Sequence, residues 1–199
     1  MIKIFEAVDQ KYWYMDEERT ICCGRPLIQQ GFLKQAKELR TKNQSMIIKS
    51  KAKLLVTSCP ICYQSFTKEY NLPIKVMHHT EYIRELVASG RLKLRKDDLK
   101  VVYHDPCELG RGCGIYNEPR EVLKSVATLV KAKSEKEKSL CCGFNLGSTV
   151  LSMEQQTKIR DAAVDSLMYK NPDLIATACP MCKKAFNHAT TLQVKDIAE

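Results

Sequence analysis

The second half of the chain alternates short apolar runs with segments spaced as amphipathic helices. The run Lys100-Val-Val-Tyr103 predicts a strand that ends just before Cys107. Leu129-Val130 leads toward a second strand, and the apolar run from Leu174 to Ala178 predicts a third, buried strand. Helices are predicted between these strands, at residues 118–126 and 153–169. Strands that alternate with helices indicate an α/β fold with a mostly parallel sheet.

The first half follows the same order. Its pattern predicts a helix from Ile2, a strand at Tyr12–Met15, a helix at Leu27–Lys49, a strand before Cys59, a helix after it, and a further helix at Glu81–Ala88. The aromatic residues around Trp13 are interpreted as packing on the predicted strand. The hydrophobic pattern therefore predicts one α/β unit twice.

Two cysteine motifs repeat along the chain at nearly the same distance. Leu54-Leu-Val-Thr-Ser-Cys59-Pro-Ile-Cys62 recurs 120 residues later as Leu174-Ile-Ala-Thr-Ala-Cys179-Pro-Met-Cys182. Ile21-Cys22-Cys23-Gly24 recurs 119 residues later as Leu140-Cys141-Cys142-Gly143. Two independent motifs that share nearly one offset indicate an internal duplication. The predicted domains are residues 1–99 and 100–199, two tandem pseudo-symmetric α/β units, with their ligand sites at the carboxyl ends of the strands.

Composition is typical of a globular protein, and without a secretion signal we expect the chain in the cytoplasm. Of 199 residues, 44% are hydrophobic, and no apolar run approaches the roughly 20 residues of a membrane-spanning helix. No secretion signal is visible, so membrane contact is expected only indirectly, through a partner. The formal charge of +9 comes largely from lysines scattered through predicted helices. Because aromatic residues do not alternate with these lysines, we expect a solvated basic surface and no nucleic-acid partner.

Ten cysteines are unusual in a reducing compartment, where thiols stay reduced unless a metal or catalysis uses them. Cys-Pro-x-Cys at the start of a helix suits metal binding, because the helix N-terminus lowers the pKa of a thiol. Pro60 and Pro180 fit the first turn, where the missing N–H has no helical partner. Gly24 and Gly143 allow a sharp turn after the adjacent cysteines. Adjacent cysteines point in different directions and therefore suit two irons better than one zinc.

The second unit presents a characteristic spacing. Cys107 is followed after 33 residues by Cys141 and Cys142, and after a further 36 residues by Cys179 and Cys182. This pattern resembles the cysteine-rich CCG domain of heterodisulfide reductase and its relatives. These include iron–sulfur subunits of anaerobic glycerol-3-phosphate dehydrogenase, glycolate oxidase and lactate-utilisation systems. The resemblance implies that the five cysteines hold a noncubane [4Fe–4S] cluster.

The first unit departs from this pattern. It has Cys22, Cys23, Cys59 and Cys62, and no leading cysteine precedes them. The simplest expectation is that the chain is a piece of a longer protein, or a subunit completed by another chain. A cluster, a partial cluster, a zinc ion and an empty site are the four alternatives for this first set. Cys113 is interpreted as a spare thiol, and His104 as a packed or capping histidine.

Three classes of function follow from these motifs. The family resemblance implies an iron–sulfur electron-transfer subunit of an oxidoreductase complex, with a disulfide among the implied substrates and flavoprotein or ferredoxin-type subunits as partners. The alternative is a structural zinc protein without redox activity. A nucleic-acid-binding zinc ribbon needs short hairpins between its cysteine pairs, and here 35 and 36 residues separate them. Because no nucleotide-binding fingerprint is present, flavin or nicotinamide chemistry would belong to a partner, and no catalytic residue is assigned.

Overall fold

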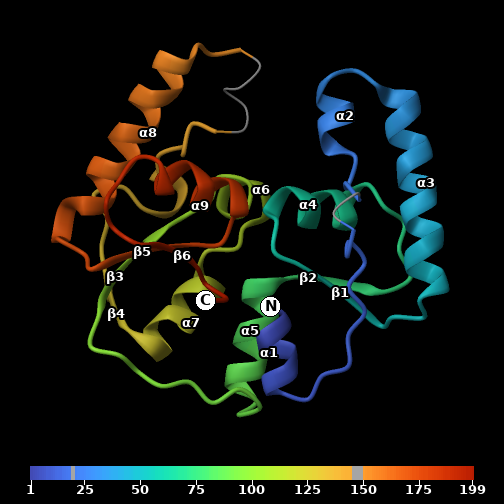
Figure 1. Ribbon diagram of the computed structural model, residues 1–199, viewed down its shortest axis with the longest axis horizontal. Helices are drawn as coiled ribbons and strands as arrows, with labels where there is room; N and C mark the ends of the chain where they lie inside the picture. The colour runs from blue at the N-terminus through green and yellow to red at the C-terminus, as the bar shows by residue number, and fades with distance from the viewer. Residues whose placement is uncertain (19–20, 145–149) are drawn as a thin grey trace. The chain divides into compact units, whose positions relative to one another are not determined.

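A computed structural model describes residues 1–18, 21–144 and 150–199 (Figure 1). By its internal contacts the chain divides into two compact units, Met1–His79 and Thr80–Glu199. Each unit contains a parallel sheet together with helices, so the predicted α/β class is confirmed. The division of the sequence into repeats at residues 1–99 and 100–199 stays a prediction. Within the described ranges, no helix is long and apolar enough to cross a bilayer.

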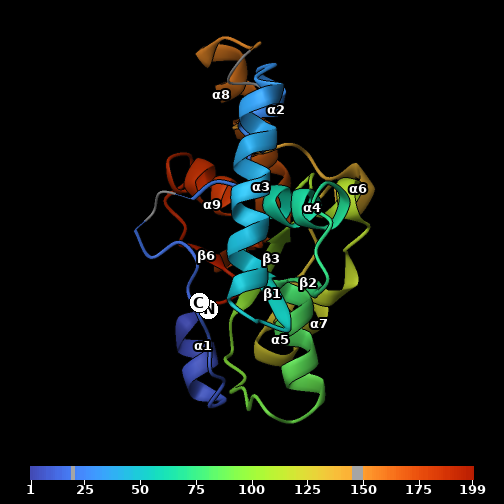
Figure 2. The same cartoon turned by 90° about the vertical axis from the view of Figure 1, so that its right-hand side faces the viewer.

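The first unit is built around two strands. β1 and β2 run parallel, with Leu54 opposite Lys75 and Thr57 opposite His78. The short helix α2 contacts both α3 and α4, and both views show α2 beside the long helix α3 (Figures 1 and 2). The elements are α1 (Ile2–Ala7), α2 (Arg25–Gln29), α3 (Leu33–Lys49), β1 (Leu54–Thr57), α4 (Pro60–Lys68) and β2 (Lys75–His78).

Two predictions for this unit were wrong. Residues 12–15 form no strand, and Tyr12, Trp13 and Tyr14 are 45%, 52% and 51% exposed. A strand needs a hydrogen-bonded neighbour, and within the described residues β1 pairs with β2 alone. The predicted helix at Leu27–Lys49 is two helices, because the chain turns at Gly31, whose φ is +82°.

The second unit has four parallel strands in the order β4-β3-β5-β6. The predicted strands near residues 100, 129 and 174 are confirmed, and so are the helices before and after the last of these strands. The elements are α5 (His79–Ala88), β3 (Lys100–His104), α6 (Gly110–Cys113), α7 (Asn117–Val126), β4 (Thr128–Val130), the 3₁₀ turns η1 (Lys136–Lys138) and η3 (Met168–Lys170), α8 (Met153–Leu167), β5 (Leu174–Thr177), α9 (Pro180–Asn187) and β6 (Val194–Asp196).

The strand order creates a switch point between β3 and β5. After β3 the chain turns to β4 on one side, whereas after β5 it continues to β6 on the other. Right-handed crossovers then place the connecting helices on opposite faces. Figure 1 shows α8 and α9 on one side of this sheet and α7 on the other. The adjacent carboxyl ends of β3 and β5 thus form a topological switch point, the position at which α/β sheets bind ligands.

Candidate metal centre

The switch point of the second unit carries cysteines from both of its strands. β3 ends at His104, which is in register with Thr177, the last residue of β5. Cys107 follows the end of β3, and Cys179 follows the end of β5 as the N-cap of α9. Cys182 lies in the first turn of α9. Because the two strands are hydrogen-bonded neighbours and end together, the cysteines that follow them lie at one edge of the sheet although they are far apart in the sequence.

The five predicted cysteines of this unit form one row of hydrogen-bonded thiols. Cys107 bonds to Cys141, Cys141 to Cys142, Cys142 to Cys182, and Cys182 to Cys179. The Sγ atoms of Cys182 and Cys142 are 3.3 Å apart. No disulfide joins any of the ten cysteines, all of which lie in the described part of the chain. The fold therefore brings all five residues of the predicted set together.

The hydrogen bonds within this row determine where negative charge collects. Thiol hydrogen bonds from Cys107 and Cys142 hold the pKa of Cys141 well below its usual value, and the N–H of Gly143 contributes by donating to its Sγ at 3.3 Å. The same contacts raise the pKa of Cys107, and they raise that of Cys142 to about 12. Hydrogen bonds to Cys142 and Cys179, followed by burial, raise the pKa of Cys182. Of Cys107, Cys141, Cys142 and Cys182, Cys141 is thus the thiol most readily ionised.

Gly143 is required where the Cys-Cys-Gly turn meets α8. Its φ is +74°, and a Cβ placed there would lie 2.7 Å from the backbone oxygen of Gln156. Any larger residue would both adopt a left-handed conformation and push the turn away from the helix. The glycine of the motif therefore allows Cys142 to reach the buried end of the row.

A buried ion pair fixes the loop that carries Cys141 and Cys142. The guanidinium of Arg120 donates to both carboxylate oxygens of Asp105, at 2.6 and 2.7 Å. The Asp105 carboxylate also accepts a hydrogen bond from the backbone N–H of Lys136 at 2.8 Å. The backbone carbonyl of Asp105 accepts one from the hydroxyl of Ser139 at 3.2 Å. One end of the loop before the cysteine motif is thereby held to the end of β3.

Two more side chains hold the same loop closer to the cysteines. Nε2 of His104 lies 3.2 Å from the carbonyl of Leu140, and its Nδ1 lies 3.4 Å from the hydroxyl of Thr177. Arg111 donates to the carbonyls of Glu137 and Ser139, at 3.0 and 2.8 Å. Burial lowers the pKa of His104 to about 4, so the ring is neutral at physiological pH. The interpretation of His104 as a packed histidine agrees with this position.

The first unit assembles its four predicted cysteines in the same way. Cys59 is the N-cap of α4 and Cys62 lies in its first turn, while Cys22 and Cys23 precede Gly24, the N-cap of α2. Cys62 is hydrogen-bonded to both Cys23 and Cys59. These bonds lower the pKa of Cys23 to about 6 and that of Cys59 to about 7, and they raise that of Cys62. Burial raises the pKa of Cys22, which is hydrogen-bonded to Cys23.

The buried side chains of Asn43 and Tyr70 are hydrogen-bonded to the backbone of the Cys22–Cys23 turn. Nδ2 of Asn43 lies 2.8 Å from the Cys22 carbonyl, and the Tyr70 hydroxyl lies 2.9 Å from the Cys23 carbonyl. Sequence reasoning did not single out Asn43, Tyr70 or Arg120. A signal was present for Asn43, which occupies the same helix face as the buried Ala36 and Ile47.

Neither set of thiols is closed around one metal ion. Among the described residues, no group of three or more His, Cys, Asp or Glu side chains is already arranged for a single ion. In both units the contacts run from thiol to thiol. Cys113 ends α6, and its role as a spare thiol stays a prediction.

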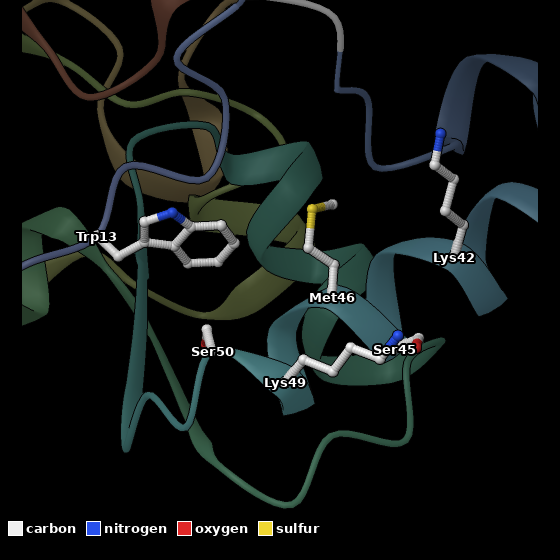
Figure 3. Close-up of a pocket in the computed structure, with 6 residues that line it drawn as sticks. All are labelled: Trp13, Lys42, Ser45, Met46, Lys49 and Ser50. Carbon is white, nitrogen blue, oxygen red and sulfur yellow. The ribbon is translucent and has the colours of Figure 1, made fainter.

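An open pocket in the first unit has a different character. Its lining consists of Trp13, four residues of α3 (Lys42, Ser45, Met46 and Lys49) and the C-cap of that helix, Ser50. The indole of Trp13 faces the side chain of Met46 (Figure 3). These six residues include no cysteine, histidine or carboxylate.

The comparison with known families agrees with the cysteine geometry. The family described as CCG, cysteine-rich domain, matches residues 3–67 and 101–187. The chain belongs to the CCG cysteine-rich domain family. The two matched segments contain all nine predicted ligand cysteines of this CCG protein. The family resemblance inferred from the cysteine spacing is thus confirmed.

Curated relatives of this CCG protein are redox proteins by name. It is 30% identical over 218 residues to the EtfAB:quinone oxidoreductase of Syntrophomonas wolfei, covering 100% of the chain and 30% of that protein. It is 28% identical over 207 residues to a subunit of the dihydromethanophenazine:CoB–CoM heterodisulfide reductase of Methanosarcina barkeri, covering 98% of the chain and 50% of that relative. It is 35% identical over 151 residues to FadF of Bacillus subtilis, a probable iron–sulfur-binding oxidoreductase, covering 73% of the chain and 21% of FadF.

These relatives favour iron–sulfur binding over a purely structural zinc protein. The chain spans half or less of the length of each.

Proposed function

We propose that this chain carries electrons within a larger oxidoreductase complex through iron–sulfur clusters bound by its cysteines. The observation that carries the proposal is the row of five hydrogen-bonded thiols at the switch point of the second unit. Thiolates are the protein ligands of iron–sulfur clusters, and a bound cluster supplies reversible one-electron oxidation and reduction.

In the second unit the ligands are Cys107, Cys141, Cys142, Cys179 and Cys182. Cys142, Cys179 and Cys182 are buried and belong to the apolar core around Val102 and Phe186. Such surroundings keep water from the bound sulfur atoms, and the free N–H groups at the start of α9 offer hydrogen bonds to them. The noncubane [4Fe–4S] cluster implied by the family resemblance is our proposal for this site, because it uses all five thiols.

In the first unit the ligands are Cys22, Cys23, Cys59 and Cys62. Four thiols satisfy either an iron–sulfur cluster or a closed Cys₄ zinc site. The lowered pKa values of Cys23 and Cys59 favour the thiolate form that either metal requires. We propose a metal site here as well. Measurement of bound iron, acid-labile sulfide and zinc distinguishes an iron–sulfur cluster from a zinc ion.

The partners of the chain are other redox subunits. Flavoprotein or ferredoxin-type subunits deliver or accept the electrons, and a disulfide is one acceptor, as the name of the heterodisulfide reductase relative indicates for that protein. The basic character of the chain, with a formal charge of +9, favours partners with acidic surfaces.

Anaerobic purification followed by metal and acid-labile sulfide analysis tests the proposal. We expect brown protein with iron and sulfide in similar amounts, a signal in electron paramagnetic resonance after reduction or oxidation, and loss of most of the iron in the Cys142→Ser variant. Colourless protein with stoichiometric zinc in both units would refute the electron-transfer function and favour the structural alternative.

A further inference from the structure

The turn that carries Cys22 and Cys23 is fixed by a chain of three hydrogen bonds made by two buried side chains. Asn43 is 1% exposed, and its Nδ2 donates to the Cys22 carbonyl at 2.8 Å and to the Tyr70 hydroxyl at 3.0 Å. Tyr70 is 5% exposed, and its hydroxyl donates in turn to the Cys23 carbonyl at 2.9 Å. Both hydrogens of the amide are thereby used, and two successive peptide carbonyls of the motif are held.

An apolar residue would fill the buried position 43 without the free-energy cost of removing a polar amide from water. Ala36 and Ile47 occupy the same buried face of α3, and a polar side chain there is tolerated because its hydrogen bonds are made. Holding two successive carbonyls sets the orientation of both peptide planes, and with them the directions of the Cα–Cβ bonds from which the two thiols project. Gly24, with a φ of +90°, completes the turn by donating its N–H to the Cys22 Sγ at 3.4 Å.

The second unit holds its equivalent turn with different residues. Positions 119 or 120 residues after Asn43 are both alanine, Ala162 and Ala163, and Thr190 stands 120 residues after Tyr70. There the carbonyl before the motif lies beside His104 at the end of β3. The first unit has the helix α1 ahead of its motif instead of a strand. The Asn43–Tyr70 pair is thus not a shared feature of the repeat but belongs to the four-thiol site.

We propose that Asn43 and Tyr70 are positioning residues that preorganise Cys22, Cys23, Cys59 and Cys62 as a metal site in its own right. The inference rests on the proposed function in assuming that these thiols bind metal, and it adds the residues that hold them ready. Side chains that orient metal ligands change metal affinity by about 10–100-fold when replaced.

Cobalt(II) is the probe, because its thiolate charge-transfer band reports ligation whether or not the chain takes up iron. The background is the full chain with Cys141, Cys142 and Cys182 replaced by serine, so that bound cobalt reports the first unit. Tyr70→Phe removes one hydroxyl, and Asn43→Asp keeps the shape while removing both donors. We expect each to weaken cobalt binding in a chelator competition by about 10–100-fold and to lower the intensity of the band.

Phe66→Leu is the matched control. The Phe66 ring packs edge-on against Tyr70 with a centroid distance of 4.8 Å, so the substitution loosens the same core without touching the hydrogen bonds. We expect a lower melting temperature but an unchanged charge-transfer band and cobalt affinity. A positioning role and a general loss of stability therefore give different results.

Three outcomes would overturn the inference. These are cobalt affinities of Tyr70→Phe and Asn43→Asp equal to that of the background, a loss for Phe66→Leu as large as theirs, or a background that binds no cobalt. The proposed function fails separately, when the unsubstituted chain takes up neither iron nor sulfide. A chain that binds cobalt but no iron would refute the iron–sulfur proposal and still test the positioning residues.

Discussion

Replacement of Arg120 by methionine tests whether the Asp105–Arg120 ion pair supports the second unit. The side chains of Arg120 and Asp105 are 9% and 3% exposed, and Arg120 also lies over the ring of Tyr103 at 5.1 Å. Arg120→Met keeps most of the side-chain volume but leaves the Asp105 carboxylate buried, with the N–H of Lys136 still donating to it. An uncompensated buried charge costs about 3–5 kcal/mol in the free energy of unfolding.

Restoring neutrality should recover part of that loss. In the double variant Asp105→Asn with Arg120→Met, the amide oxygen still accepts from Lys136 and no buried charge remains. We expect the double variant to be more stable than Arg120→Met alone, with a coupling energy of about 1–3 kcal/mol between the two sites. Arg120→Lys keeps the charge but loses the bidentate hydrogen bond to Asp105. We expect a loss in the free energy of unfolding between zero and that of Arg120→Met.

Urea unfolding of the metal-free, reduced chain measures these differences. Hydrogen exchange followed on peptides that cover β3 and β5 assigns them to the second unit. Lys158→Met is the control, because its ion pair with Glu154 at 2.7 Å is 75% and 77% exposed and contributes at most about 0.5 kcal/mol. A loss in Arg120→Met no larger than that in Lys158→Met would refute the reasoning.

Three further predictions concern the cysteine turns. Cys142→Ser should remove more iron from reconstituted protein than Cys23→Ser, because five thiols hold a cluster more firmly than four; equal losses on iron analysis would contradict this. Gly143→Ala should destabilise the chain more than Gly31→Ala in urea unfolding. Both sit at positive φ, which costs about 1–2 kcal/mol, but an added Cβ at Gly31 meets nothing within 4 Å. Because burial holds the pKa of His104 at about 4, the unfolded chain takes up the proton first as the pH falls. Stability should therefore drop between about pH 6.5 and 4 by up to about 3 kcal/mol, and a His104→Gln variant should show a flatter titration.

The sequence by itself determined the class of fold and the identity of the candidate ligands. The repeat offset placed Cys22 and Cys59 in one unit and Cys141 and Cys179 in the other, and the structure brings each set together. These features are local, because a motif at a strand end or a helix start is specified by its neighbours in the chain.

Predictions from local sequence patterns were wrong where strand pairing or a helix interruption determined the secondary structure. The aromatic run around Trp13 has the composition of a strand, yet no neighbouring strand offers it hydrogen bonds in the described residues. The predicted long helix from Leu27 is interrupted at Gly31, since a glycine with positive φ ends one helix and allows the next to begin in a new direction.

Tertiary structure alone decided how the thiols meet. The strand order puts the ends of β3 and β5 side by side, so that Cys107 and Cys179 follow neighbouring strand ends although 71 residues separate them in the sequence. Asn43 and Arg120 look like ordinary polar residues of helices until folding buries them against a cysteine turn or a carboxylate. Contacts of this kind close long loops, and hydrophobic periodicity records which face of an element is buried but not which distant element covers it.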